Sequence, residues 1–236
     1  MGGCVSIEGM YNKALGNSLK TYKIRKTEVT IISQKPLHSL SENLVIPLFE
    51  LRVETEVNFI VDLAGMECED SEKSSFGAEL AKLIPGEVTT QLKAHSVAVV
   101  NLERFSQFPF NLSKIIFVLV EKSKNFAREV LPKVLNLIFS TAESRNMVEL
   151  TIGRLNKVGT IGSNDTEISI QIAKELIKFL TTPNDKESQL RRIFFTSNSR
   201  QLDMELVNAM DTEMRKYLLL CSQQQLKGAT TGAAQN

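Results

Sequence analysis

The sequence predicts an α/β protein, a three-layer α/β/α fold around a mixed, mostly parallel central sheet of about six strands. Its apolar residues switch repeatedly between a spacing of two and helical spacing, which is typical of strands that alternate with helices. The run Ile115 to Val120 is apolar throughout, as in a strand covered by helices on both faces. With 42% apolar residues in 236, the chain can build the core of a single domain.

Six segments are expected to form the strands. They are Glu28 to Ser33, Glu50 to Ala64, Val97 to Asn101, Lys114 to Glu121, Met147 to Ile152 and Arg192 to Ser197. The second segment alternates at its start and becomes continuously apolar later, so it forms either one long strand or a hairpin. We expect Ile115 to Val120 to be central in the sheet, because it is the most apolar of the six.

Three apolar stripes predict helices. The first contains Phe126, Val130, Leu131, Val134, Leu135, Ile138 and Ala142, the second Ile168, Ile172, Ala173, Leu176, Ile177 and Leu180, and the third Leu202, Leu206, Met210, Met214, Tyr217, Leu218 and Cys221. Pro132 would kink the first helix or mark its first turn, and Asn164 with Glu167 resembles a capping box before the second. A short helix over Gly77 to Ile84 would end at Pro85-Gly86.

These elements divide the chain into three parts. Residues 1–26 are expected to be an N-terminal anchor segment, and residues 27–221 a single α/β domain. Residues 222–236 are rich in Gln, Gly, Ala and Thr, so we expect a disordered tail.

Composition argues against several functions. A formal net charge of +1 provides no general attraction for nucleic acid. Three cysteines and two histidines, scattered along the chain, argue against a zinc site or a disulfide framework, and no motif implies a cofactor. No apolar run approaches the roughly 20 residues of a transmembrane helix, and the N-terminus has no secretory signal.

The first six residues, Met-Gly-Gly-Cys-Val-Ser, match the N-myristoylation pattern. Gly2 would carry the acyl chain, and Cys4 could carry an S-palmitoyl group as the second signal that stable anchoring requires. A weaker candidate for that signal is the basic run Lys20, Lys23, Arg25 and Lys26. We therefore expect a lipid-anchored protein on the cytoplasmic face of a membrane, the alternative being an ordinary unmodified N-terminus.

The segment between the fifth predicted strand and the second long helix could bind phosphate. It contains Gly159, Thr160, Ile161, Gly162, Ser163 and Asn164. Glycine allows close approach of the backbone, and the following helix start offers unpaired N–H groups to an anion. No lysine follows the second glycine, so the segment is not a P-loop. The alternative is an ordinary loop ending in a helix cap.

The order of these elements over about residues 45 to 215 resembles the macrodomain family. Val61-Asp62-Leu63-Ala64-Gly65 stands where the family has an Asn-containing turn, and Gly159-Thr160-Ile161-Gly162 is similar to its second phosphate-contacting loop. The resemblance implies binding of ADP-ribose or a related nucleotide, with Asp62 as a candidate ribose contact. The alternative, a surface or capping role for Asp62, is the commoner one for such a residue.

Two departures from the family pattern argue against tight ADP-ribose binding and against hydrolase activity. The acidic segment Met66 to Ser75 replaces the glycine-rich first loop and would repel a diphosphate. No asparagine corresponds to the one that positions the ribose in the family's hydrolases, so we name no catalytic residue. The sequence therefore predicts a lipid-anchored, non-catalytic binding or scaffold module with a protein partner. The alternative is an ADP-ribose reader or hydrolase with an altered phosphate loop.

Overall fold

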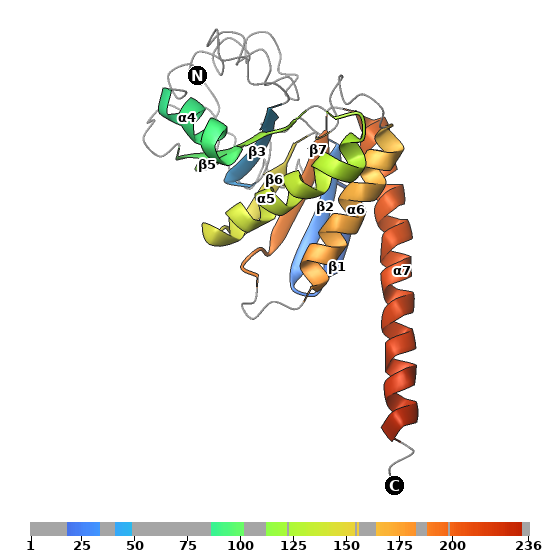
Figure 1. Ribbon diagram of the computed structural model, residues 1–236. Helices are drawn as coiled ribbons and strands as arrows, with labels where there is room; N and C mark the ends of the chain where they lie inside the picture. Colours follow the sequence, from blue (N-terminus) through green and yellow to red (C-terminus); the bar gives the residue numbers. More distant parts are fainter. Residues whose placement is uncertain are drawn as a thin grey trace, which may run out of the picture.

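One seven-stranded sheet organises the protein (Figure 1). The computed structural model describes residues 18–33, 41–48, 86–101, 112–121, 123–153, 155, 164–182, 188–197 and 199–232. The strands are β1 (Ser18–Ile24), β2 (Thr27–Ser33), β3 (Asn43–Leu48), β4 (Val97–Asn101), β5 (Lys114–Leu119), β6 (Glu149–Ile152) and β7 (Arg192–Ser197). Their order in the sheet is β1-β2-β7-β6-β3-β5-β4.

The sheet is mixed and mostly parallel, as predicted. Strands β2, β7, β6, β3 and β5 pair in parallel, and β1 and β4 pair antiparallel at the two edges. All five parallel strands therefore end at one edge of the sheet, which we call the carboxyl edge. Parallel strands need crossover connections, which helices commonly supply.

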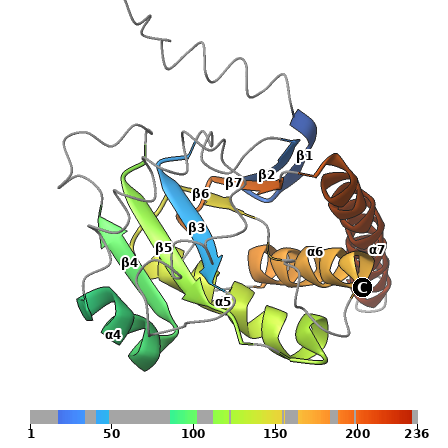
Figure 2. The ribbon, with the colours of Figure 1, turned by 90° about the horizontal axis from the view of Figure 1, so that it is seen from above.

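Helices complete the layers. They are α4 (Gly86–His95), the π-helix η2 (Phe126–Val130), α5 (Leu131–Ser144), α6 (Asp165–Thr181) and α7 (Arg200–Gly232). Helices α5 and α6 lie side by side along the sheet, with α7 beside α6 near β1 (Figure 2). Helix α4 packs against β4 and β5 near the other edge. None of the helices in the described part of the chain combines the length and apolarity needed to cross a bilayer.

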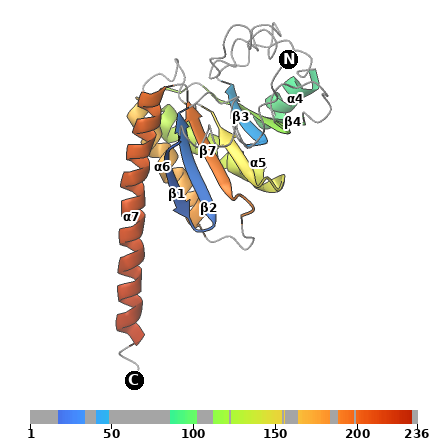
Figure 3. The same cartoon turned by 180° about the vertical axis from the view of Figure 1, so that it is seen from behind.

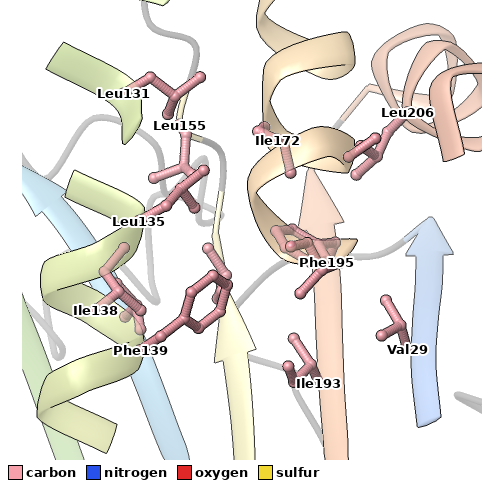
Figure 4. Close-up of a cluster of buried hydrophobic side chains, with 14 of the residues drawn as sticks. Val29, Leu131, Leu135, Ile138, Phe139, Leu155, Ile172, Ile193, Phe195 and Leu206 are labelled. Atoms are coloured by element: carbon pink, nitrogen blue, oxygen red, sulfur yellow. The ribbon is translucent and has the colours of Figure 1, made fainter. Parts of the chain in front are cut away.

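Both faces of the sheet are buried. On the face toward α5, α6 and α7, a row of paired residues crosses five strands: Ile31, Phe195, Ile152, Val45 and Ile116. Figure 4 shows side chains of this core between the helices and the strands. The opposite face buries Ile32, Leu44, Ile46, Ile115, Phe117 and Phe194. This burial explains why several strands lack an alternating pattern.

Strand β1 lies within the segment predicted to be an anchor. Ser18–Ile24 pairs with β2, so the sheet starts inside residues 1–26 and not at residue 27. Long-range contacts hold this strand: the Tyr22 hydroxyl donates to the backbone oxygen of Val207 at 3.0 Å and to Asp211 Oδ1 at 2.8 Å. Its ladder partner β2 follows after the two-residue turn Arg25-Lys26, and these contacts with α7 add to that pairing.

Strand β3 was also not predicted, and it contains a proline, which is rare inside a sheet. Its backbone explains how Pro47 is tolerated. The Val45 oxygen accepts from Gly153 N, and the Leu48 oxygen accepts from Val120 N. The backbone N–H and C=O groups of odd-numbered β3 residues therefore point toward β6. The pairing of β6 with β3 ends at Val45 and Ile152. Pro47 lies beyond that point, where no ladder bond requires its missing N–H.

Two other predictions need correction in detail. Strand β5 lies between β3 and β4, next to an edge strand, so Ile115 to Val120 is doubly covered but not central. The helix containing Pro132 begins with a π-turn, in which the Leu131 N–H donates to the Phe126 oxygen. The proline then occupies the first turn of α5, immediately after the π-turn, a part of a helix in which proline is tolerated.

The C-terminal helix differs most from expectation. Helix α7 continues to Gly232, so residues 222–232 are helical where the sequence predicts a disordered tail. The third apolar stripe is buried at Leu202, Leu206 and Met210, but Leu218 is exposed. A helix of 33 residues is about 50 Å long, whereas a seven-residue strand spans about 23 Å. The helix therefore runs past the sheet. The predicted strand Glu50 to Ala64 and helix Gly77 to Ile84 lie outside the described residues.

Candidate functional site

The carboxyl edge of the sheet has the topology of a ligand site. Strands β3 and β6 are adjacent and parallel. After β6 the chain passes through α6 to β7 on one side, whereas the next described strand after β3 is β4, on the other side. Connections that leave neighbouring strands in opposite directions define a switch point, where open α/β sheets usually bind their ligands. The predicted phosphate segment lies between β6 and α6 in the sequence.

Of the residues predicted to form the site, the structure describes Asn164. Its Oδ1 accepts a hydrogen bond from Glu167 N at 2.7 Å, which confirms the predicted N-cap. The carboxylate of Glu167 accepts from Arg128 Nε at 2.9 Å, so this side chain links α6 to η2. The predicted site residues Gly159, Thr160, Ile161, Gly162, Ser163, Asp62, Gly2 and Cys4 lie outside the described residues.

A small cavity lies at the carboxyl edge, between the sheet and the first turns of α6 and α7. Its lining includes Ile172, Phe195 and Leu206, which come together from α6, β7 and α7 in Figure 4. The cavity volume is about 30 Å³, room for one or two water molecules at most. A nucleotide would therefore have to bind outside it, along the carboxyl edge.

The polar centre of this cavity is Asp203, in the first turn of α7. The residue is 3% exposed, and its Oδ2 has no hydrogen-bond partner among the described residues. Burial raises the pKa of the carboxyl to about 6 from 3.8, although hydrogen bonds from the side chains of Ser197 and Ser33 and from the Ser197 backbone lower it. The Asp203 carboxyl thus connects the first turn of α7 to Ser33 and Ser197, the last residues of β2 and β7.

The loop between β7 and α7 positions this group. Ser197 Oγ donates to the Ser199 oxygen at 2.9 Å and accepts from Ser199 N at 3.0 Å. The Asp203 N–H donates to the same Ser199 oxygen at 3.1 Å, so Ser199 is the first acceptor of the helix. A carboxylate held this way can accept hydrogen bonds from N–H or O–H donors at the cavity mouth.

Asp203 did not emerge from the sequence, although a signal was present. It falls one turn before Val207 and two turns before Met210, both buried, so helical spacing places it on the inward face. An acidic residue on an apolar stripe indicates either a buried polar contact or a functional group. Within the described part of the chain, no group of three His, Cys, Asp or Glu side chains is placed to hold a metal ion.

Comparison with protein-family models and with curated sequences gives no match. Solved structures do match. A mutant macrodomain of Oceanobacillus iheyensis superposes with a TM-score of 0.61 at 11% identity, covering 84% of this chain and 94% of that one. The same macrodomain with ADP gives 0.56 at 12% identity, covering 84% and 97%. A mutant with ADPR gives 0.54 at 10% identity, covering 83% and 98%. The chain therefore has a macrodomain-like α/β/α fold, as the sequence predicted.

Proposed function

We propose that this protein is a macrodomain-like binding module whose ligand is a nucleotide of the ADP or ADP-ribose class, bound at the carboxyl edge of the sheet. The observation that carries the proposal is the fold. It is shared over 83–84% of the chain with macrodomain structures that contain ADP or ADPR, and its switch point between β3 and β6 lies where such sheets take ligands.

The chemistry of the carboxyl edge supports a phosphate-containing ligand. Helix α6 begins there, directly after the Gly159 to Asn164 segment, and its first-turn N–H groups favour an anion. Asn164 Oδ1 occupies one of these donors, the Glu167 N–H. The acidic residues Asp165 and Glu167 also lie in this turn and weaken the attraction. We therefore expect modest affinity.

Binding without turnover is the second part of the proposal. It follows from the sequence, since Asp62, Leu63, Ala64 and Gly65 stand where the family's hydrolases place their ribose-positioning amide. Turnover of an ADP-ribosylated protein by the purified chain would contradict it.

A membrane location is the third part. The N-terminal sequence supports it: Gly2 as the myristoyl acceptor, and Cys4 as a site for a second acyl chain. Together these would hold the module on the cytoplasmic face of a membrane, where a protein partner could be recruited.

Calorimetric titration of ADP-ribose and ADP tests the ligand assignment. The informative variant is Gly162→Glu, because the added carboxylate would fill the proposed anion site. Asn136→Glu is the matched control, since it adds the same charge at an exposed position of α5. We expect saturable binding by the parent and the control and none by Gly162→Glu. Equal binding by all three, or none by the parent, would contradict the assignment.

A further inference from the structure

Helix α7 carries an apolar surface where it leaves the domain. Figures 1 and 3 show its C-terminal part continuing past the ends of the strands. Leu218, Leu219 and Leu220 are 58%, 62% and 59% exposed. The other large apolar side chains exposed in the described part of the chain, Val148 and Met204, lie elsewhere in the sequence. Three consecutive helical positions point in directions about 100° apart, so the leucines surround much of the helix.

Two segments of the chain contain basic residues and no acidic ones. Residues 18–27 contain Lys20, Lys23, Arg25 and Lys26 and no acidic residue. After Glu213 the chain contains Arg215, Lys216 and Lys227, again without an acidic residue.

The fold brings the two basic segments together. Lys20 Nζ lies 2.6 Å from Asp211 Oδ1, which holds β1 against α7. At the end of β1, Arg25 donates to the Thr181 oxygen at 2.6 Å and also hydrogen-bonds to Tyr217. The turn between β1 and β2 therefore lies beside α7 immediately before the leucines.

The acidic residues of this part of α7 are already paired. Asp211 accepts from Lys20 and from Tyr22, and Glu213 accepts from Lys216 at 2.6 Å. Lys20 and Lys216 therefore balance the charges of Asp211 and Glu213, and the exposed guanidinium group of Arg215 lies three residues before the leucines. A surface that combines exposed leucines with positive charge matches the interface of an anionic bilayer.

We propose that this surface binds an anionic lipid membrane independently of acylation. It consists of Leu218, Leu219 and Leu220 with Arg25, Lys26 and Arg215, and we call it the α7 basic–leucine surface. The inference deepens the membrane location proposed above, by naming a second signal other than Cys4. A single myristoyl chain gives marginal binding, and one chain with a basic patch is sufficient for stable anchoring.

The N-terminus can reach the same membrane. Strand β1 starts at the carboxyl edge, and the basic–leucine surface lies at its other end, about 23 Å away along the strand. The 17 residues before Ser18 can extend about 55 Å. Myristoylated Gly2 and the α7 surface can therefore engage one bilayer together.

A second copy of the chain is a less favourable occupant. In a two-fold contact the same patch faces itself, so Arg215 and the basic turn would be brought close to their own copies. Like charges at that distance repel, whereas anionic headgroups attract them.

Vesicle co-sedimentation tests the proposal with the full chain carrying Gly2→Ala, so that no acyl group contributes. The vesicles are phosphatidylcholine alone or with one-third phosphatidylserine. The test variant adds Leu218→Gln, Leu219→Gln and Leu220→Gln, and the control adds Met204→Gln, an exposed apolar residue of the same helix. A third protein adds Arg215→Gln.

We expect salt-sensitive binding to the phosphatidylserine vesicles and little binding to phosphatidylcholine. The leucine variant should lose at least about tenfold in partitioning and the Arg215→Gln variant about fivefold, while Met204→Gln binds like its parent. Since the leucines are exposed, the variants should melt at the parental temperature. Absence of binding by the Gly2→Ala chain, or equal binding by the leucine variant, would overturn the proposal. So would a dimer of the parent that the leucine variant dissociates, because a second copy would then occupy the surface.

Discussion

Ionisation of Asp203 should destabilise the protein near neutral pH. Its carboxyl is 3% exposed, and burial raises its pKa to about 6, from an ordinary value of 3.8. The folded state therefore binds the proton more tightly than the unfolded state does. The stability gained from this proton is complete below pH 3.8 and is lost as the pH rises through 6.

The size of the effect follows from the two pKa values. Each pKa unit corresponds to 1.36 kcal/mol, so ionised Asp203 costs about 3 kcal/mol at pH 7 relative to its protonated form. An Asp203→Asn variant has no charge to desolvate, and its amide can still hydrogen-bond to Ser33 and Ser197. Its free energy of unfolding relative to the parent should therefore rise by about 2 kcal/mol between pH 4 and pH 7.

Urea unfolding of both proteins across pH 4 to 7.5 measures this difference directly. Glu121→Gln is the control, since it removes an exposed carboxylate and should leave the parental pH dependence unchanged. If Asp203→Asn and the parent lose stability in parallel over this range, the carboxylate is not penalised by burial and the reasoning is refuted. A carbon-detected NMR titration of the Asp203 carboxyl provides an independent measurement of its pKa.

Three further predictions concern the core, a helix cap and the anchor. Val118→Asp should abolish cooperative thermal unfolding, because it buries an unpaired charge in a doubly covered strand. The control Val148→Asp, at a 49% exposed position, should still melt cooperatively. A parental melt for Val118→Asp would contradict the burial of Val118. Asn164→Ala should lower the free energy of unfolding by about 1 kcal/mol, because the helix cap to Glu167 N is lost. Urea unfolding measures this change, with exposed Asn136→Ala as the control. Equal changes in the two variants would exclude a capping role. Gly2→Ala should move most of the protein from the membrane to the soluble fraction of cells, because each buried acyl CH₂ contributes about 0.8 kcal/mol; unchanged fractionation would refute the anchor.

Local patterns predicted the elements that local contacts define. Helix α6 was predicted from its buried stripe, and its N-cap at Asn164 was predicted from residues three positions apart, which interact in any helix that starts there. Strands β2, β4, β5, β6 and β7 were predicted from short apolar runs. The helical stripe of α5 was predicted too, whereas the π-turn that accommodates Pro132 was not.

Elements that depend on distant partners were not predictable in this way. Strand β1 carries exposed lysines at an edge. Its partner β2 follows at once, but the burial of Tyr22 depends on α7, where Asp211 lies 189 positions away. Strand β3 contains a proline that is tolerated because its neighbour β6 ends before it. The exposure of Leu218 depends on how far α7 extends beyond the sheet. The spacing of apolar residues does not predict that extent.

The sequence by itself determined the fold class of this protein, because alternating strand and helix patterns are set by neighbouring residues and by burial. It also determined the chemistry offered at the N-terminus and in the glycine-containing loop. The tertiary structure alone decided the strand order, and with it the meeting of Asp203 with Ser33 and Ser197 at the carboxyl edge. It also decided that a basic turn lies beside α7 immediately before three exposed leucines. Both outcomes depend on which distant segments pack together, and that choice is made by the whole core and not by any local pattern.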